Sequence, residues 1–153
     1  MKITGCEVLH CGAGWRNFSF LKLQTDDGIT GISEYNESYG SKGLSAVIEA
    51  LVETQIGQNP FNHEAISQQL YAMTRQAPGG INQQAMAAIE NAMMDIKGKA
   101  LDQPLYNLIG GLCRDKVVCY PHNGGGSIDA LVESCRRSVD EGWKFVRWGV
   151  EAD

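Results

Sequence analysis

The sequence has little of what marks several common classes of protein. It holds 4 prolines and 3 histidines in 153 residues, and 18 Asp and Glu outnumber 13 Lys and Arg, for a net charge of −5. Without a basic excess, nucleic acid and anionic membrane are not expected partners. No apolar run approaches the roughly 20 residues of a membrane span, and the N-terminal MKITGCEVLH lacks the apolar core of a signal peptide. These absences predict a cytoplasmic protein.

The sequence also lacks a cysteine pattern typical of metal fingers or disulfide frameworks. Its 5 cysteines are odd in number, and none forms a C-x-x-C pair. Reduced thiols are the expected state of all of them: Cys6, Cys11, Cys113, Cys119 and Cys135. The hydrophobic content of 43% and charged content of 20% are typical of a globular chain.

The first part of the chain reads as strands followed by helices, which indicates an α+β domain. Asp26-Asp27-Gly28 is a tight-turn signal between two β-prone runs. Asn62 is placed to cap a helix that ends near Arg75. We predict a three-stranded antiparallel meander followed by a helical bundle, with strands at 2–10, 18–25 and 29–35 and helices at 44–55, 62–75 and from 84 onward.

The composition changes after Gly111, where a second pattern begins. A β-prone run at 116–120 precedes a glycine-bearing loop, a helix capped by Ser127 and a strand-like run at 144–148. Strand, helix and strand in about 35 residues make one βαβ unit. The helix is expected to turn five apolar residues inward: Ile128, Leu131, Val132, Cys135 and Val139.

The stretch from Gln84 to Gly111 carries a recognisable signature. Its helical part repeats apolar residues at spacings of three and four: Ala85, Ala88, Ile89, Ala92, Met93, Ile96 and Ala100. The order Ala87-Ala88-Ile89-Glu90, Ala92, Asp95, Gly98-Lys99, Pro104-Leu105, Leu108-Ile109-Gly110-Gly111 resembles the N-terminal signature of the mandelate racemase/muconate lactonizing enzyme family, a branch of the enolase superfamily. Gln84 departs from it, since the family usually has a small residue there.

The resemblance implies a domain plan. Residues 1–112 would form an enolase-like N-terminal capping domain, and residues 113–153 would begin a C-terminal TIM-like (β/α) barrel. A complete barrel needs about 250 residues, so the chain is expected to be a truncated enzyme. A homo-oligomer is expected for the parent protein.

The resemblance also implies a chemistry. The family abstracts a proton next to a carboxylate and holds the enediolate with Mg²⁺, whose ligands lie at the ends of the third, fourth and fifth barrel strands. This chain ends after the second, so we expect no metal site in it and no turnover by it alone. The parent activity would be an acid-sugar dehydratase. The alternatives are a racemase, epimerase or cycloisomerase of the same family, or a non-catalytic binding or assembly module.

Two loops of the capping domain select the substrate in relatives, and their counterparts here are 11–17 and 36–43. Trp15 could exclude water and Arg16 could pair with an acid. Hydrogen bonds to hydroxyl groups are expected from three further side chains: Asn36, Tyr39 and Lys42. This composition suits a polyhydroxy acid.

Two later residues are candidates for contact with substrate. Arg147 stands where many relatives carry the first lysine of a Lys-x-Lys base motif, and Gly149 replaces the second. Arginine stays protonated, so it is a poor base but can bind a carboxylate bidentately. His122, expected where the first barrel strand ends, could act as a donor or weak acid. Proton abstraction would then fall to a later residue. The acidic residues Glu34, Glu37, Glu90 and Asp95 are expected to be structural or solvated, and neither His10 nor His63 shows a partner signal.

Overall fold

The computed structural model describes residues 1–149 and divides the chain into two compact units. The first unit is Met1–Gly111 and the second is Leu112–Asp153. Residues 150–153, the end of the predicted second domain, lie outside the described part. The predicted fold class is confirmed, since the first unit is α+β and the second is a βαβ unit.

The first unit opens with the predicted meander. Strands β1 (Ile3–Gly12), β2 (Asn17–Thr25) and β3 (Thr30–Tyr35) pair antiparallel in the order β1-β2-β3. The boundaries differ from the predicted ones by one or two residues. Along β2, Leu21 and Leu23 are fully buried, while their neighbours Phe20, Lys22 and Gln24 are partly exposed. This alternation shows that one face of the sheet is covered.

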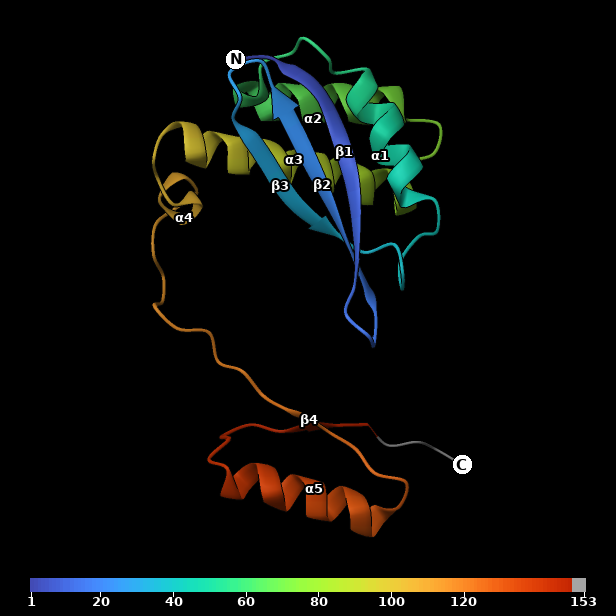
Figure 1. Ribbon diagram of the computed structural model, residues 1–153, viewed down its shortest axis with the longest axis vertical. Helices are drawn as coiled ribbons and strands as arrows, with labels where there is room; N and C mark the ends of the chain where they lie inside the picture. The colour runs from blue at the N-terminus through green and yellow to red at the C-terminus, as the bar shows by residue number, and fades with distance from the viewer. Residues whose placement is uncertain (150–153) are drawn as a thin grey trace. The chain divides into compact units, whose positions relative to one another are not determined.

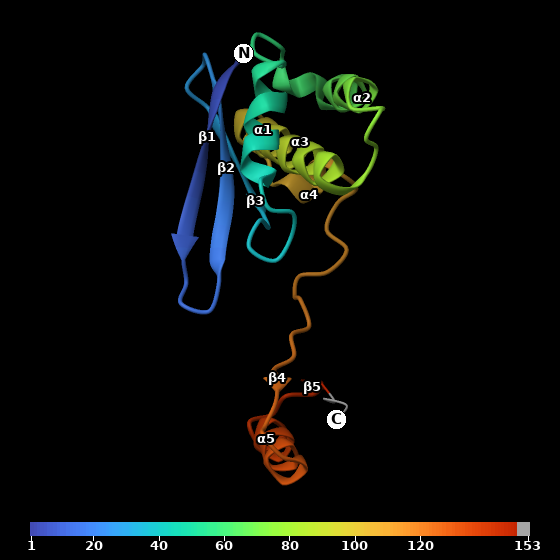
Figure 2. The same cartoon turned by 90° about the vertical axis from the view of Figure 1, so that its right-hand side faces the viewer.

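Helices cover that face, as Figure 2 shows with the sheet seen on edge and the helices all on one side of it. The three longer helices of this unit (Figure 1) contribute apolar residues to a core that they share with the sheet. The elements are α1 (Leu44–Glu53), the 3-10 turn η1 (Pro60–Asn62), α2 (His63–Met73), α3 (Gly80–Ala100) and the single turn α4 (Leu105–Leu108).

Helix α3 carries the signature and lies against the sheet. It begins at Gly80, before the predicted stretch, and the predicted stripe is buried from Ala85 to Ile96 while Ala100 is partly exposed. The Asp95 carboxylate accepts hydrogen bonds from the Ile32 backbone N–H at 2.7 Å and from the Lys99 ammonium at 2.6 Å. The signature residues therefore attach the helix to the edge strand, in agreement with a structural role for Asp95.

The predicted cap of α2 is wrong. Asn62 precedes the helix but makes no side-chain hydrogen bond to it. The chain has already begun to turn in η1, where the Asn59 side chain accepts from the Phe61 N–H at 3.0 Å. Asn62 therefore lacks the extended backbone from which a side chain reaches the first turn, since its φ and ψ are −88° and 40°.

The second unit contains β4 (His122–Asn123), α5 (Ile128–Asp140) and β5 (Arg147–Trp148), with β4 parallel to β5. Ser127 caps α5 as predicted, and its hydroxyl accepts from the Ala130 N–H at 3.2 Å. The strand expected at 116–120 is absent from the described chain. The strand before α5 is instead β4, whose residues His122 and Asn123 pair with β5.

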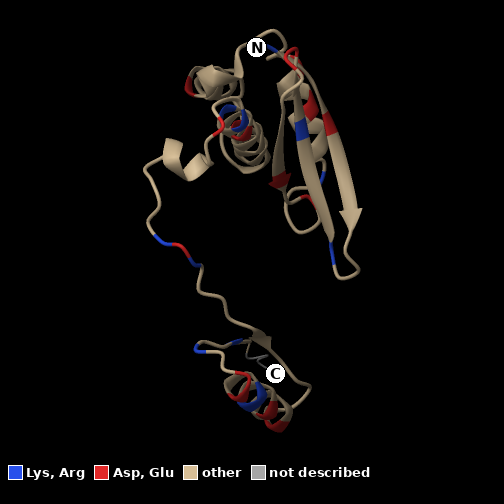
Figure 3. Cartoon of the chain, turned by 60° about the vertical axis from the view of Figure 1, so that its left-hand side comes forward, with Lys and Arg blue, Asp and Glu red and all other residues tan. Residues whose placement is uncertain are grey.

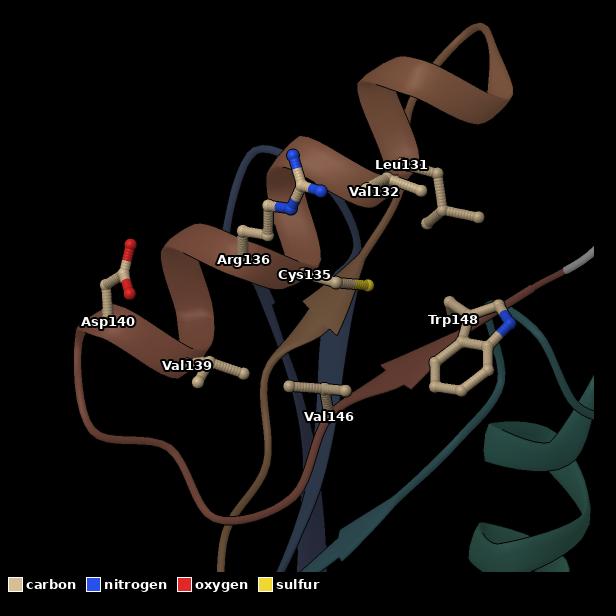
Figure 4. A pocket seen from close by; sticks show the side chains of 8 residues that line it. All are labelled: Leu131, Val132, Cys135, Arg136, Val139, Asp140, Val146 and Trp148. Carbon is tan, nitrogen blue, oxygen red and sulfur yellow. The ribbon is translucent and has the colours of Figure 1, made fainter.

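The expectation that α5 turns its apolar residues inward is wrong for most of them. Ile128 is 80% exposed and Val139 is 61% exposed. Two strands of two residues each are too short to cover a helix of 13 residues. Figure 4 shows the uncovered face, where side chains of α5, of β5 and of the residue before β5 line an apolar hollow: Leu131, Val132, Cys135, Arg136, Val139, Asp140, Val146 and Trp148.

Charge is distributed without a concentrated basic region on the helices. Helices α3 and α5 each carry both acidic and basic side chains (Figure 3). Within residues 1–149, no helix combines the length and the apolar character needed to cross a membrane.

Candidate functional site

The two loops expected to select substrate are joined to each other. The β1–β2 hairpin loop and loop 36–43 leave the sheet at the same end (Figure 1). The Tyr39 hydroxyl donates to the Trp15 carbonyl at 3.3 Å, and the Ser38 hydroxyl donates to the Asn17 carbonyl at 3.1 Å. The side-chain oxygen of Asn36 is already used within the chain, since it accepts from the Tyr39 N–H at 3.0 Å. Asn36 therefore shapes its own loop.

Arg16 already has a carboxylate partner in the chain. Its guanidinium lies 2.7 Å from Oε1 of Glu34. It also lies over the rings of Phe18 and Trp15, at 3.8 and 5.2 Å from the ring centroids. The expected pairing of Arg16 with an acidic substrate stays a prediction, and within the chain the partner of Arg16 is Glu34. The arginine is thus held at a fixed place beside the aromatic side chains of the hairpin.

The outer surface of this loop pair is left to solvent. Trp15 and Tyr39 are each 69% exposed, and Lys42 is exposed as well. An indole, a phenol ring and an ammonium group are therefore presented from one end of the sheet. These groups can stack on, donate to and attract a small polar anion.

Glu37 fixes the base of loop 36–43, in agreement with the structural or solvated role expected for it, although its partners were not predicted from the sequence. Its carboxylate accepts from the Gly43 N–H at 2.7 Å, from the Ser45 N–H at 3.3 Å and from the Ser45 hydroxyl. The hydrogen bond from the Ser45 side chain, with those from the two backbone N–H groups, lowers the pKa of Glu37. The available signal was a glycine in the capping position of α1, which leaves its first N–H groups to a residue farther away.

In the second unit the two candidate residues on the strands are neighbours. His122 pairs with Arg147 and Asn123 pairs with Trp148. Asn123 is buried, and its side-chain oxygen accepts from hydroxyl groups of α5, those of Ser134 at 3.0 Å and Ser138 at 2.7 Å. Asn123 thus faces α5.

Because side chains alternate along a strand, His122 and Arg147 lie together on the face opposite to α5. Both are exposed there, and Tyr120 stacks on the His122 ring with centroids 5.8 Å apart. In a (β/α) barrel the helices form the outer ring. The face that His122 and Arg147 share is therefore the one that a barrel turns toward its interior.

The fold of the two units defines a class of protein. A three-stranded antiparallel sheet with helices on one face, followed by a βαβ unit, occurs in enolases. An enolase of Pantoea ananatis solved with bound D-gluconate and Mg superposes with a TM-score of 0.87 at 27% identity, over 96% of this chain and 36% of that one. Residues 11–110 match the N-terminal domain of the mandelate racemase/muconate lactonizing enzyme family. The chain belongs to that family.

Two curated relatives are similar along almost all of the chain. The D-galactonate dehydratase family member RspA of Cellvibrio japonicus is 36% identical over 148 residues, which are 96% of this chain and 37% of that protein. A D-mannonate dehydratase of Novosphingobium aromaticivorans is 36% identical over 150 residues, with the same two shares. The chain thus spans a little over a third of the length of these relatives.

Proposed function

We propose that this chain is part of an acid-sugar dehydratase, a lyase that removes water from a polyhydroxy acid. The observation that supports this most is the similarity to the galactonate and mannonate dehydratases over 96% of the chain. Dehydration removes a proton next to the carboxylate and expels the β-hydroxyl as water. The substrate is then a small acid with several hydroxyl groups.

The joined loops would select that substrate. Trp15 and Tyr39 present ring surfaces and a hydroxyl group, and Lys42 presents a positive charge. Arg16 is held by Glu34, so its charge is largely balanced. We infer that substrate hydroxyls are contacted by Lys42, Asn36 and Tyr39. Arg16 instead packs against the Trp15 ring and holds it in place.

The strand pair would hold the reacting end of the substrate. Arg147 remains protonated and can bind a carboxylate with two parallel hydrogen bonds. His122, its neighbour on β4, can donate a hydrogen bond or a proton to a substrate oxygen. The base that takes the α-proton is then a different residue.

The two strands of the second unit, β4 and β5, do not offer a magnesium site. Mg²⁺ prefers oxygen ligands and is usually held through carboxylates. β4 and β5 carry histidine, asparagine, arginine and tryptophan, and no carboxylate. We therefore assign no step of the reaction to residues of this chain acting through the ion, and expect the purified 153-residue chain to show no turnover of acid sugars with Mg²⁺.

A chimera tests the proposal. Residues 1–149 would replace the matching part of the D-mannonate dehydratase relative, and the purified protein would be assayed with Mg²⁺ and a panel of D-gluconate, D-mannonate and D-galactonate. We expect the corresponding 2-keto-3-deoxy acid from at least one of them. Arg147→Met should reduce kcat/KM by at least about 100-fold, or about 2.7 kcal/mol at 1.36 kcal/mol per factor of ten. Arg114→Met, in the irregular segment, should retain activity.

The other outcomes separate the alternatives. A folded chimera that epimerises an acid without losing water would favour a racemase or epimerase. A folded chimera that binds the acids and converts none would favour a binding module. Either result would contradict the proposed dehydratase, and the unmodified relative serves as the positive control for the assay.

A further inference from the structure

Three potential metal ligands meet on the surface of the first unit, where α2 begins beside the middle of α3. His63 and Glu64 are the first residues of α2, and Glu90 lies on α3. One ligand atom from each of the three side chains lies within 4.8 Å of the other two. Two helices thus bring one imidazole and two carboxylates together, although no partner of His63 was expected from the sequence.

The surroundings of the His63 imidazole leave one of its ring nitrogens without a partner. Nδ1 of His63 is shielded from solvent and makes no hydrogen bond. Its nearest carboxylate oxygen, Oε1 of Glu90, lies 3.6 Å away, beyond the usual upper limit of about 3.2 Å for such a bond. Most buried polar side-chain atoms have a hydrogen-bond partner. A ring nitrogen without a hydrogen-bond partner, in a side chain grouped with two carboxylates, can act as a metal ligand.

The spacing suits a metal ion between the two groups. Zn²⁺ binds a histidine nitrogen at about 2.0–2.1 Å and a carboxylate oxygen at about 2.0–2.2 Å. At a tetrahedral angle, two such ligands are roughly 3.4 Å apart. The 3.6 Å between His63 Nδ1 and Glu90 Oε1 is close to this value.

The ligand types select among ions. Mg²⁺ and Ca²⁺ prefer sites made of oxygen alone, whereas an imidazole nitrogen favours Zn²⁺ and its neighbours in the first transition row. Two carboxylates also balance the charge of a divalent ion, which matters because the first turn of a helix carries a partial positive charge. Glu64 is exposed and the Glu90 side chain is 40% exposed, so a hydrated ion has a path of entry.

We propose that His63, Glu64 and Glu90 bind one Zn²⁺ ion, with water completing its coordination. The ion would connect the start of α2 to α3. This site is separate from the loop pair and uses none of the residues assigned to substrate, so it stands whether or not the chain belongs to a dehydratase.

Titration of the reduced full chain with Zn²⁺ tests the proposal. Isothermal titration should show one equivalent bound, and the same equivalent should raise the Tm of the chain. His63→Gln and Glu90→Gln should each weaken this binding at least about tenfold and abolish the shift in Tm. His10→Gln is the matched control, since it removes a histidine of β1 and should leave both readouts unchanged.

The cysteines are present in every variant, so any zinc that they hold is common to all of the titrations. Co²⁺ in place of Zn²⁺ distinguishes the ligands further, because thiolate coordination gives intense charge-transfer absorption that imidazole and carboxylate do not. Circular dichroism of the metal-free variants checks that each is folded. The proposal is overturned if the chain binds no Zn²⁺, or if His63→Gln binds it as tightly as the natural sequence does.

Discussion

At the scale of single residues, Gly31 marks a close approach between the sheet and α3. A Cβ atom added there would lie 2.0 Å from the Ala92 carbonyl oxygen and 2.9 Å from Cγ1 of Ile96. The small residues of the signature helix thus have a direct partner in β3. The absence of a side chain at Gly31 allows the backbone of the strand to pack onto the backbone of the helix.

Gly31→Ala should therefore destabilise the first unit, because the strand or helix must shift to accept the methyl group. We expect a loss of about 1–3 kcal/mol in the free energy of unfolding, measured in urea. Gly5→Ala in β1 is the matched control, since its Cβ would meet only the Gln24 side chain at an ordinary 3.6 Å. Equal stability of the two variants would contradict this account of the packing.

Glu37 should give the first unit a pH-dependent stability. Its pKa is lowered in the folded state by the Ser45 side chain and by backbone N–H groups. The stabilisation is therefore complete above the unfolded pKa of about 4.3 and is lost as the pH falls through the folded pKa. Glu37→Gln should be less stable than the natural sequence at pH 7, and the two should converge as the pH falls through the lowered pKa of Glu37.

Urea unfolding at a series of pH values measures that difference. Ser45→Ala removes the donor with the largest effect on the Glu37 carboxylate, so the folded pKa of Glu37 should rise toward its unfolded value. The acid-induced loss of stability should therefore be smaller in this variant and complete at a higher pH. A constant gap between Glu37→Gln and the natural sequence from pH 7 to 3 would show that the carboxylate charge is not involved.

At the scale of elements, the hydrogen bond between the two loops should restrain the hairpin tip. Tyr39→Phe removes the hydroxyl that donates to the Trp15 carbonyl and leaves the ring in place. We expect faster amide hydrogen exchange at residues 13–17 with little change in global stability, since the bond is exposed. Tyr71→Phe, an exposed tyrosine on α2, should exchange like the natural sequence. Unchanged exchange in Tyr39→Phe would contradict the prediction, because it would show that this hydrogen bond does not restrain the hairpin tip.

Elements with strong periodicity were predictable from the sequence, and contacts between elements were not. The meander and the buried stripe of α3 follow from apolar spacing, and Ser127 was identified from local capping chemistry. His10 and His63 were read as unpartnered, yet His10 Nδ1 lies 3.0 Å from the Ser19 hydroxyl and His63 faces Glu90. Those partners lie across a strand pair and across two helices, where sequence spacing carries no information.

The candidate site divides in the same way. The residue types of the loops pointed to a polar small molecule, and both segments are loops in the structure, between β1 and β2 and between β3 and α1. Their contact with substrate stays a prediction. That Arg16 pairs with Glu34 and that Asn36 bonds within its own loop could not be read from the sequence, because both depend on where the hairpin meets β3. The pairing of His122 with Arg147 needed the register of two strands that are 24 residues apart in the chain.

At the scale of the whole molecule, the uncovered face of α5 and β5 should cause self-association. Val139 is 61% exposed and belongs to the apolar hollow of Figure 4. Contiguous apolar surface of this kind is favoured to pack against another surface. We expect light scattering to show a mass that rises above the 16.7 kDa of one chain as concentration increases.

Val139→Ser should shift that rise to higher concentration. Ile56→Ser, which changes an isolated exposed residue of the first unit, should leave the concentration dependence as it is. A chain that stays monomeric at all concentrations would contradict the prediction, and so would an equal response of the two variants.

The alternation along β4 has a consequence for how this part of the chain tolerates changes in length. His122 and Asn123 face opposite sides of the strand pair, and Asn123 is fixed to α5 by Ser134 and Ser138. A single inserted or deleted residue within β4 would exchange the two faces and turn the imidazole toward the serines. We expect insertions and deletions to be accepted in the irregular segment before Pro121 or in the glycines at 124–126. Between His122 and Asn123 they should destroy the arrangement of His122 beside Arg147.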